Sequence, residues 1–306
     1  MTRRRFAVTA LATCVAASAC RQADAARTAR ADSSMLAQRE TRLEQSLSQP
    51  DTAAKDSTTA DRKAIARWIM PRNLDELSGI ALTHDGRLLA HGDEKAQVSE
   101  IDYRRGVVTK QFVVGHPTVK ADLEAITIAH GFVYLLASNG TLYEFEEGTN
   151  GARVDYTTHD TRLGKECEFE GLAFDSTLNA LLLACKHVGT KHLKDDLVIY
   201  RWKLEGGGDR LSRLTVPLKD IVGPIGEKHF HPSDITVDPF TGDYVLIAGI
   251  EKAMVEITPE GRIVFARKLP GDHDQPESVA ITKDSILIIG DEAKRVPAVL
   301  TLYRWP

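Results

Sequence analysis

Short apolar segments alternate with turn residues along most of the chain, and one phrase of polar and apolar positions recurs among them. From Ala64 onward the apolar runs are bounded by turn pairs such as Asp85-Gly86 and Arg105-Gly106, a pattern typical of short antiparallel strands. The phrase has a polar third residue, a mostly small fourth, a branched aliphatic fifth and Ala or Thr sixth. Its five copies are residues 76–81, 122–127, 168–173, 231–236 and 275–280.

The spacing of the phrase predicts a β-propeller. It recurs roughly every 45 residues, with one longer interval before the fourth copy, and each propeller blade is a small antiparallel sheet that cannot bury its faces alone. We expect five blades of four antiparallel strands within residues 62–306. A sixth blade would need an inner strand without a recognisable phrase between Cys185 and Ser233. In the second blade we expect strands at residues 125–129, 132–137, 142–146 and 153–157.

The last blade is one strand short, and an orphan strand near the start of the domain can complete it. Residues 65–70 have a strand pattern with no local partner. Only three strands are expected after the fifth phrase begins, at residues 278–282, 286–290 and 299–305. Pairing the orphan strand with the last blade would close the ring and remove exposed sheet edges.

The first twenty residues have the composition of an export signal. Arg3, Arg4 and Arg5 precede an apolar stretch that is too short to span a bilayer. Residues 17–20, Ala-Ser-Ala-Cys, resemble a bacterial lipobox in which Cys20 is acylated, and residues 2–6 resemble the twin-arginine motif. Sec and twin-arginine export therefore both stay open. The alternative to lipidation is a cleaved signal that leaves Cys20 unmodified or removes it.

Residues 21–61 lack any strand pattern and predict a flexible tether. The segment is rich in Ala, Ser, Thr, Asp, Arg and Gln, so it cannot bury enough apolar surface to fold alone. Leucines at helical spacing allow a transient helix between Ser34 and Ser48. The tether would hold the domain away from a membrane.

The net charge argues against a nucleic-acid partner. The formal charge is −4, and loss of the signal would remove three arginines and no acid. Binding of phosphate groups requires a positive surface, so a cation is the more natural ligand. We expect an exported monomer in the periplasm or on the outer membrane.

The candidate site lies at one mouth of the central channel. The first strand of each blade is innermost, so the start of each phrase and the loops after second strands meet on one face. The third column of the phrase consists of Ser78, Glu124, Glu170, Ser233 and Glu277. Acids close by within the phrases are Glu76, Asp122, Glu168 and Asp234. Loops after the second strands add His91, Asp93, Asn139, Lys186, His187, Glu251, Asp291 and Glu292. We call this face the acidic mouth.

The chemistry of the third column favours a hard cation. Strand alternation puts the third column on the same face as the fifth, which we expect to be core between blades. Carboxylates beside such a core need a proton, a hydrogen bond or a counter-charge. Glu124, Glu170 and Glu277 with nearby hydroxyls suit Ca²⁺ better than zinc. The alternative is that each Glu bonds backbone amides of the next blade and staples the ring together.

Other motifs carry less information. No nucleophile elbow, Walker loop or His-Glu-x-x-His motif occurs in the sequence. His229 and His231 lie in a loop, where solvated histidines are commoner than ligands. Cys167 and Cys185 flank one predicted hairpin, so they form either a disulfide in an oxidising compartment or two small buried thiols.

The ordered set of phrases resembles the SdiA-regulated family, the YjiK-like proteins of bacteria, over roughly residues 70–306. The resemblance rests on Leu77-Ser78-Gly79-Ile80, Asp122-Leu123-Glu124-Ala125-Ile126, Glu168-Phe169-Glu170-Gly171-Leu172, Pro232-Ser233-Asp234-Ile235 and Pro276-Glu277-Ser278-Val279. It implies a phytase-like propeller, exported or membrane-anchored, with a link to calcium in some members. Phytase-like phosphatases also use a cluster of Lys and Arg. Here Lys186 is the only basic residue expected at the mouth, which argues against phosphatase activity.

Three functional hypotheses follow. The leading one is a lipid-anchored propeller of the cell envelope that binds Ca²⁺ or another divalent cation in a binding or scaffold role, with a small molecule or an envelope protein as partner. The second is a metal-dependent hydrolase of phosphomonoesters or lactones, in which the ion activates water. The third is a protein-binding platform without chemistry.

Overall fold

The computed structural model describes residues 32–48, 63–205 and 210–306. Residues 32–48 form an α-helix, which is a unit of its own. This helix covers the segment between Ser34 and Ser48 for which the sequence predicts a transient helix. The expected export signal and Cys20 lie outside the described residues. Among the helices of the described segments, none combines the length and apolar character needed to cross a bilayer.

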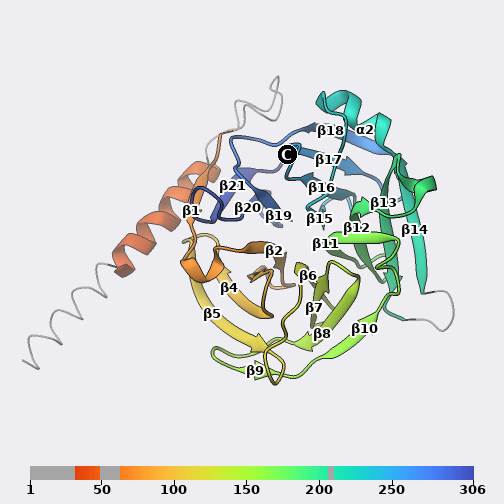
Figure 1. The fold of residues 1–306 in the computed structure, drawn as a ribbon. Coiled ribbons are helices and arrows are strands. Elements are labelled where there is room, and N and C mark those ends of the chain that lie inside the picture. The colour runs from red at the N-terminus through yellow and green to blue at the C-terminus, as the bar shows by residue number, and fades with distance from the viewer. Residues whose placement is uncertain (1–31, 49–62, 206–209) are drawn as a thin grey trace, which may run out of the picture. The chain divides into compact units, whose positions relative to one another are not determined.

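The rest of the described chain forms five sheets arranged in a ring, the blades of a β-propeller (Figure 1). Blade one contains β2 (Leu77–Leu82), β3 (Leu88–Gly92), β4 (Gln97–Asp102) and β5 (Val107–Val114). Blade two contains β6 (Leu123–Ala129), β7 (Phe132–Ala137), β8 (Thr141–Glu146) and β10 (Thr157–Asp160). Blade three contains β11 (Cys167–Asp175), β12 (Ala180–Val188), β13 (Asp196–Lys203) and β14 (Leu211–Pro217). Blade four contains β15 (Asp234–Val237), β16 (Tyr244–Ala248), β17 (Ala253–Ile257) and β18 (Ile263–Lys268).

Blade five joins the two ends of the propeller. It contains β19 (Pro276–Ile281), β20 (Ile286–Asp291), β21 (Val299–Arg304) and the strand β1 (Ala66–Ile69) from the start of the domain. β1 pairs antiparallel with β21, with Ala66 opposite Leu302 and Ile69 opposite Val299. The five-bladed ring and its closure by the N-terminal strand are therefore confirmed.

Blade two differs from the prediction in its outer strand. The expected strand at residues 153–157 is wrong, because Arg153 and Val154 form β9 (Arg153–Val154), which pairs parallel with β5 of blade one. The fourth strand of blade two is β10, which lies against β8. Glycines at 148 and 151 turn the chain away from its own blade before it returns, and Gly151 has a positive φ of 76°.

The long approach to blade four contains a helix that the sequence pattern did not predict. α2 (Leu218–Ile225) ends at Gly226, whose φ of 71° closes the helix in the left-handed conformation. Ile221 and Ile225 are buried against the core shared by blades three and four. Two short 3₁₀ turns, η2 (Arg72–Leu74) and η3 (Lys191–Leu193), occupy other connections.

The fifth column of the phrase is buried between blades, as the sequence predicts. Ile126 packs in the cluster formed by blades one and two, and Ile235 packs in the cluster formed by blades three and four. Leu172 and Val279 occupy the equivalent places in the neighbouring clusters. Consecutive inner strands therefore seal against one another around the channel.

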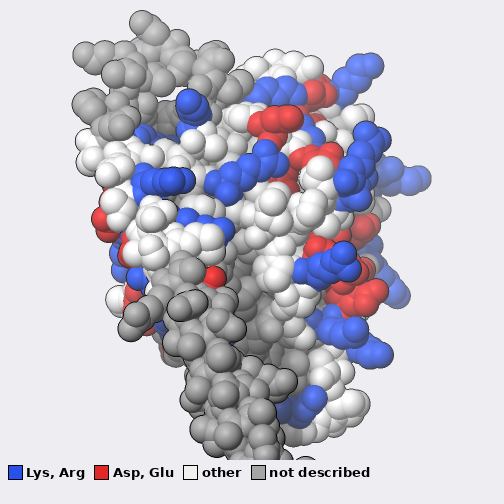
Figure 2. All heavy atoms as spheres, turned by 90° about the vertical axis from the view of Figure 1, so that its left-hand side faces the viewer, with Lys and Arg blue, Asp and Glu red and all other residues white. Residues whose placement is uncertain are grey.

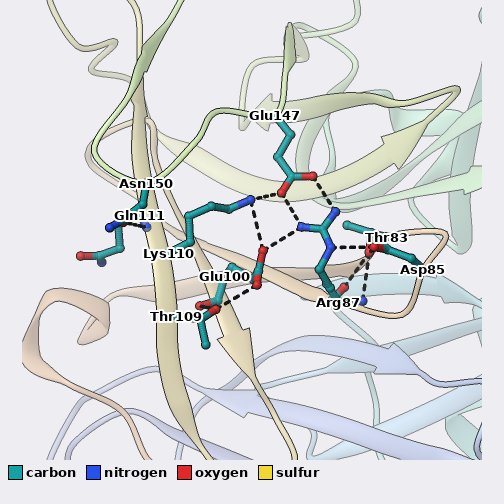
Figure 3. Close-up of polar contacts among 9 residues, drawn as sticks. All are labelled: Thr83, Asp85, Arg87, Glu100, Thr109, Lys110, Gln111, Glu147 and Asn150. Carbon is teal, nitrogen blue, oxygen red and sulfur yellow. Dashed lines mark hydrogen bonds and ion pairs between the residues drawn. The ribbon is translucent and has the colours of Figure 1, made fainter.

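Charged side chains connect blade one to blade two at the mouth of the channel opposite the acidic mouth, which we call the second mouth (Figure 3). Arg87 precedes β3, and its guanidinium bonds Glu147, which follows β8, as well as Glu100 in β4. Lys110 in β5 pairs with the same two carboxylates. On the outer face drawn in Figure 2, Lys and Arg side chains lie interspersed with Asp and Glu.

Candidate functional site

The third residue of the phrase occupies a β-bulge in four of the five blades. In blade one the register passes from Leu77 to Gly79 and leaves Ser78 unpaired. Glu124, Glu170 and Glu277 hold the same place in β6, β11 and β19. A bulge interrupts the ladder and redirects a side chain. The simple alternation that would put the third column on the face of the fifth does not hold at this position.

Lys186 is the cation around which the carboxylates of the mouth gather. Its Nζ atom lies 2.7 Å from Oε1 of Glu170. The charges of Glu277 and Glu124 also act on Lys186. Acids from blades two, three and five therefore act on one ammonium group, and Glu170 contacts it directly.

Burial raises the pKa of the carboxyl groups at this mouth. Desolvation, followed by the charge of Glu170, raises the pKa of Glu124 to about 8. Desolvation also raises the pKa of Glu170 to about 7, although Lys186 opposes the shift. The pKa values of Glu277 and Glu292 are raised for the same first reason. The cluster is therefore partly protonated near neutral pH.

The two lysines at the mouth respond differently to their surroundings. Desolvation disfavours the charged form of Lys186, but its hydrogen bond to Glu170 and the nearby acids outweigh this, so its pKa is raised. Lys252 is a second basic group, which the sequence interpretation missed although its neighbour Glu251 was included. Desolvation lowers the pKa of Lys252 even though Glu277 opposes the shift. The mouth therefore has more cationic character than the sequence predicts, but acids still outnumber bases.

Glu76 and Asp93 extend the acidic cluster to blade one. Their side chains share a hydrogen bond which, together with partial burial, raises the pKa of Glu76 to about 7. Across blades five and one, the charge of Asp93 helps to raise the pKa of Glu292, and the charge of Glu292 helps to raise the pKa of Glu76. Oδ1 of Asp93 is buried without a hydrogen-bond partner among the described residues. Asp93 therefore belongs to the cluster, as the sequence predicts.

Asp234, expected as a ligand-binding residue, instead bonds amides of neighbouring blades, the role considered above for the glutamates. Its Oδ2 accepts the N–H of Val279 at 2.8 Å, its Oδ1 accepts the N–H of Ile235 at 2.8 Å, and the backbone N–H of Leu172 bonds the same carboxyl. These amides come from blades three, four and five. Burial raises the pKa of Asp234, and the three amides oppose the shift. This side chain ties inner strands together inside the channel.

The two serines of the third column make hydrogen bonds to backbone carbonyls. Oγ of Ser78 donates to the carbonyl of Glu76 at 3.2 Å. Oγ of Ser233 donates to the carbonyl of Pro276 at 2.9 Å, which links blade four to blade five. Both serines are buried.

The side chains of three other predicted ligands bond other groups of the protein. Asp122 is exposed and accepts a hydrogen bond from Ser138 at 2.6 Å. Oδ1 of Asn139 caps its own turn by accepting the N–H of Thr141 at 3.0 Å. Asp291 is buried and lies 2.7 Å from Nδ1 of His273. The structure therefore gives Asn139 and Asp291 partners other than the carboxylate cluster, although the charge of Asp291 acts on Lys252 and the charge of Asp122 acts on Glu124.

His91 fills the space that a side chain at Gly79 would need. A Cβ atom at Gly79 would lie 2.4 Å from Nε2 of His91. Burial lowers the pKa of His91 to about 4, so the ring is neutral. Nε2 has no hydrogen-bond partner among the described residues. The small fourth column of the phrase is thus explained in blade one by this packing.

Cys167 and Cys185 form a disulfide between β11 and β12, with their Cα atoms 5.6 Å apart. The bridge lies at the same end of blade three as Glu170 and Lys186. It therefore fixes the strands that carry the ion pair.

The donor set is compatible with a hard cation, but no ligand shell is preassembled. Within residues 32–48, 63–205 and 210–306, no three His, Cys, Asp or Glu side chains are arranged to hold a metal ion. Lys186 already provides the cation that Glu170 contacts. Glu124, Glu170 and Glu277 would have to close around an ion as it enters.

A cavity of about 1070 Å³ occupies the channel on the side of the second mouth. Ile80, Ile126, Leu172 and Ile235 line it together with turn residues of the opposite rim, and no residue of the third column does. The ring of aliphatic fifth-column side chains therefore separates this cavity from the acidic mouth.

Fold and site together define a five-bladed β-propeller with an acidic cluster at one mouth of its channel. No family model and no curated protein sequence matches the chain. The structure is similar to glutaminyl cyclase from Myxococcus xanthus, with a TM-score of 0.55 and 9% identity over 81% of this chain and 97% of that one. The luciferin-regenerating enzyme has a TM-score of 0.49 and 10% identity over 78% of this chain and 95% of that one. The likeness to the cyclase supports the propeller fold.

Proposed function

We propose that the acidic mouth binds a divalent cation, with Ca²⁺ favoured, and that binding releases protons. The observation that supports this proposal is the gathering of three carboxyl groups around Lys186, which bonds Glu170 and is acted on by the charges of Glu124 and Glu277. The pKa values of all three carboxyls are raised. When all three carboxyls are ionised, the one ion pair of Lys186 with Glu170 leaves their charge incompletely balanced. An entering cation would supply it.

The kind of ion follows from the donors. Carboxylate and hydroxyl oxygens suit hard cations, and Ca²⁺ tolerates the flexible geometry that a closing shell would have. Glu124 and Glu277 are the mobile candidates, because both are only partly buried. Metal ligands must be deprotonated to bind, so the protons held by these groups leave when the ion enters.

Calorimetry on the full-length protein tests the proposal. We expect Ca²⁺ to bind with a heat that changes with the ionisation enthalpy of the buffer, because protons are released. Glu124→Gln plus Glu277→Gln should abolish the binding heat. Glu146→Gln, at an exposed position of β8, is the matched control and should leave it unchanged. Equal heats in the double variant and the control would exclude this role.

The cellular setting belongs to the same proposal. The chain would be a member of the SdiA-regulated, YjiK-like family, exported and anchored through acylated Cys20 in the cell envelope, and its binding or scaffold role would serve an envelope partner. Metabolic labelling with a fatty acid, compared between the native chain and Cys20→Ala, tests the anchor. Equal label in both would contradict it.

A hydrolase is the second candidate, favoured by the pKa values at the mouth. A carboxyl group with a pKa near the working pH can act as general acid or base, and Glu124 and Glu170 both meet this condition. A screen of lactones and phosphomonoesters with Ca²⁺, against a chelated control, tests it. Turnover that is lost in Glu124→Gln would support a hydrolase, and no turnover above the control would exclude it for these substrates.

A further inference from the structure

Three histidine rings lie in contact at the edge of the acidic mouth. The ring centre of His231 is 5.1 Å from that of His187 and 5.5 Å from that of His229. His187 belongs to β12 of blade three, whereas His229 and His231 belong to the loop between α2 and β15. The loop position of His229 and His231 favours solvated histidines, and nothing in the linear sequence brings His187 to them.

A buried carboxylate orients the central ring of this histidine cluster. Oε1 of Glu251 lies 2.7 Å from Nδ1 of His231, and Oε2 of Glu251 accepts the backbone N–H of His231 at 3.1 Å. The side chain of Glu251 is only 5% exposed. A carboxylate on one ring nitrogen fixes the tautomer and leaves the other nitrogen as a ligand, the arrangement found behind histidines that bind zinc.

We propose that His187, His229 and His231 form a binding site for a divalent transition-metal ion of the Zn²⁺ class. Two imidazoles that share a tetrahedral Zn²⁺, with Zn–N bonds of about 2.0–2.1 Å, have ring centres roughly 5 Å apart. The two ring separations in the cluster match this spacing. Three histidines would leave one coordination position open for water or another ligand.

Only small side-chain movements separate the cluster from a ligand shell. Within the described segments no three such groups are already arranged to hold an ion. His187 and His229 are exposed, and exposed side chains exchange rotamers within picoseconds to nanoseconds. His231, the partly buried member, is held in place by Glu251. The ion would thus bind to one fixed ring and draw in two mobile ones.

Lys268, which bonds the main chain of Glu251, does not compete for the carboxylate of Glu251. Nζ of Lys268 donates to the main-chain carbonyl of Glu251 at 2.8 Å and pairs with Glu227. It therefore leaves both carboxylate oxygens of Glu251 to His231.

This site goes beyond the proposed Ca²⁺ function and is chemically distinct from it. Imidazole nitrogens suit Zn²⁺, Cu²⁺ or Ni²⁺, whereas the carboxylates of the mouth suit Ca²⁺. His187 directly follows Lys186 in β12, so the open coordination position would lie beside the carboxylate cluster.

Competition between the full-length protein and a chromophoric Zn²⁺ chelator tests the site. We expect one Zn²⁺ to bind per chain with a micromolar or lower Kd. His187→Ala and His229→Ala should each weaken binding at least tenfold, and both changes are at exposed positions that should not disturb folding. Glu251→Gln keeps a hydrogen bond to His231 but removes the charge, and should weaken binding about 10–100-fold.

Two controls separate the histidine cluster from other sites. His84→Ala alters an exposed histidine of the β2–β3 turn, and Glu124→Gln alters the acidic mouth; both should leave the Kd for Zn²⁺ unchanged. Cu²⁺ bound to the native chain should give an electron paramagnetic resonance spectrum with nitrogen coupling that weakens in His229→Ala. Failure of the native chain to bind Zn²⁺, or an affinity in both His187→Ala and His229→Ala equal to that of the native chain, would overturn the proposal. Loss of Zn²⁺ binding in Glu124→Gln alone would do so as well.

Discussion

The ladder between β11 and β12 leaves out both Glu170 and Lys186, and the ammonium of Lys186 lies 2.7 Å from the carboxylate of Glu170. Because neither residue takes part in the regular pairing, both side chains can turn toward the channel. The single disulfide of the described residues joins the same two strands. Local irregularity and a covalent bridge thus position one ion pair at the centre of the acidic mouth.

Replacing Lys186 by Met should destabilise the folded chain at neutral pH. Hydrogen bonds to charged groups contribute about 1.5–3 kcal/mol, and Glu170 would be left buried among other acids. We expect a loss of about 2 kcal/mol in the free energy of unfolding, measured in urea. Lys165→Met, at an exposed position before β11, is the control. A Lys186→Met variant as stable as this control would contradict the role of the ion pair.

The free energy of unfolding should fall as pH rises from about 4.5 to about 8. The unfolded chain loses its Glu protons near pH 4.5, whereas folded Glu170 keeps its proton to about pH 7 and Glu124 to about pH 8. Over this window the folded state binds more protons, so stability decreases with pH.

Urea unfolding at pH 5.5 and pH 8.5 measures this pH dependence. Glu124→Gln cannot titrate and should reduce the decline by an amount on the order of 2 kcal/mol. Glu146→Gln should not reduce it. An undiminished decline in Glu124→Gln would show that this carboxyl has an ordinary pKa in the folded chain.

Asp234→Asn should weaken the ring without altering its sheets. The amide of Asn has one oxygen acceptor and two N–H donors, so amides from three blades could no longer all find an acceptor. A buried donor without a partner costs about 1–3 kcal/mol. Thermal and urea unfolding should show a loss in this range, and Asp155→Asn, whose side chain is 97% exposed, should show none. If Asp234→Asn loses no stability, the hydrogen bonds of Asp234 do not hold the blades together.

Replacing both Cys167 and Cys185 by Ala should lower stability only under oxidising conditions. The bridge closes a loop of 18 residues, for which the chain-entropy model gives about 3 kcal/mol. Urea unfolding with and without reductant measures the difference. If reduction leaves the gap between the native chain and the variant unchanged, the contribution is packing of the sulfur atoms and not the covalent bond.

The sequence predicts the ring well because its signals are repeated and local. Five copies of one phrase give the blades, and the unpaired strand before Pro71 gives the closure. β9 escapes prediction because two residues, Arg153 and Val154, cannot show an alternating pattern, and their partner is β5 of another blade. α2 escapes because Gly223 and Pro224 lie within it, and both residues ordinarily argue against a helix.

The acidic mouth could be predicted only in part, because its geometry depends on pairing across strands. The repeat identifies the residues of the third column. In the structure the charges of Glu124, Glu170 and Glu277 shift the pKa of Lys186 or of one another. The bulge that positions them has no compositional signal. The role of Asp234 depends on amides of three blades, and the contact of His187 with His231 depends on a strand and a loop that meet only in the folded chain.

The bulge at the third position also makes the chemistry of the mouth independent of the architecture. A residue outside the ladder can be exchanged without changing strand register, so Ser and Glu occupy equivalent places in blades of the same design. The same sheets could therefore carry a different set of side chains at Ser78, Glu124, Glu170 and Glu277. Substitutions at these four positions could therefore introduce new binding sites while leaving the strands unchanged.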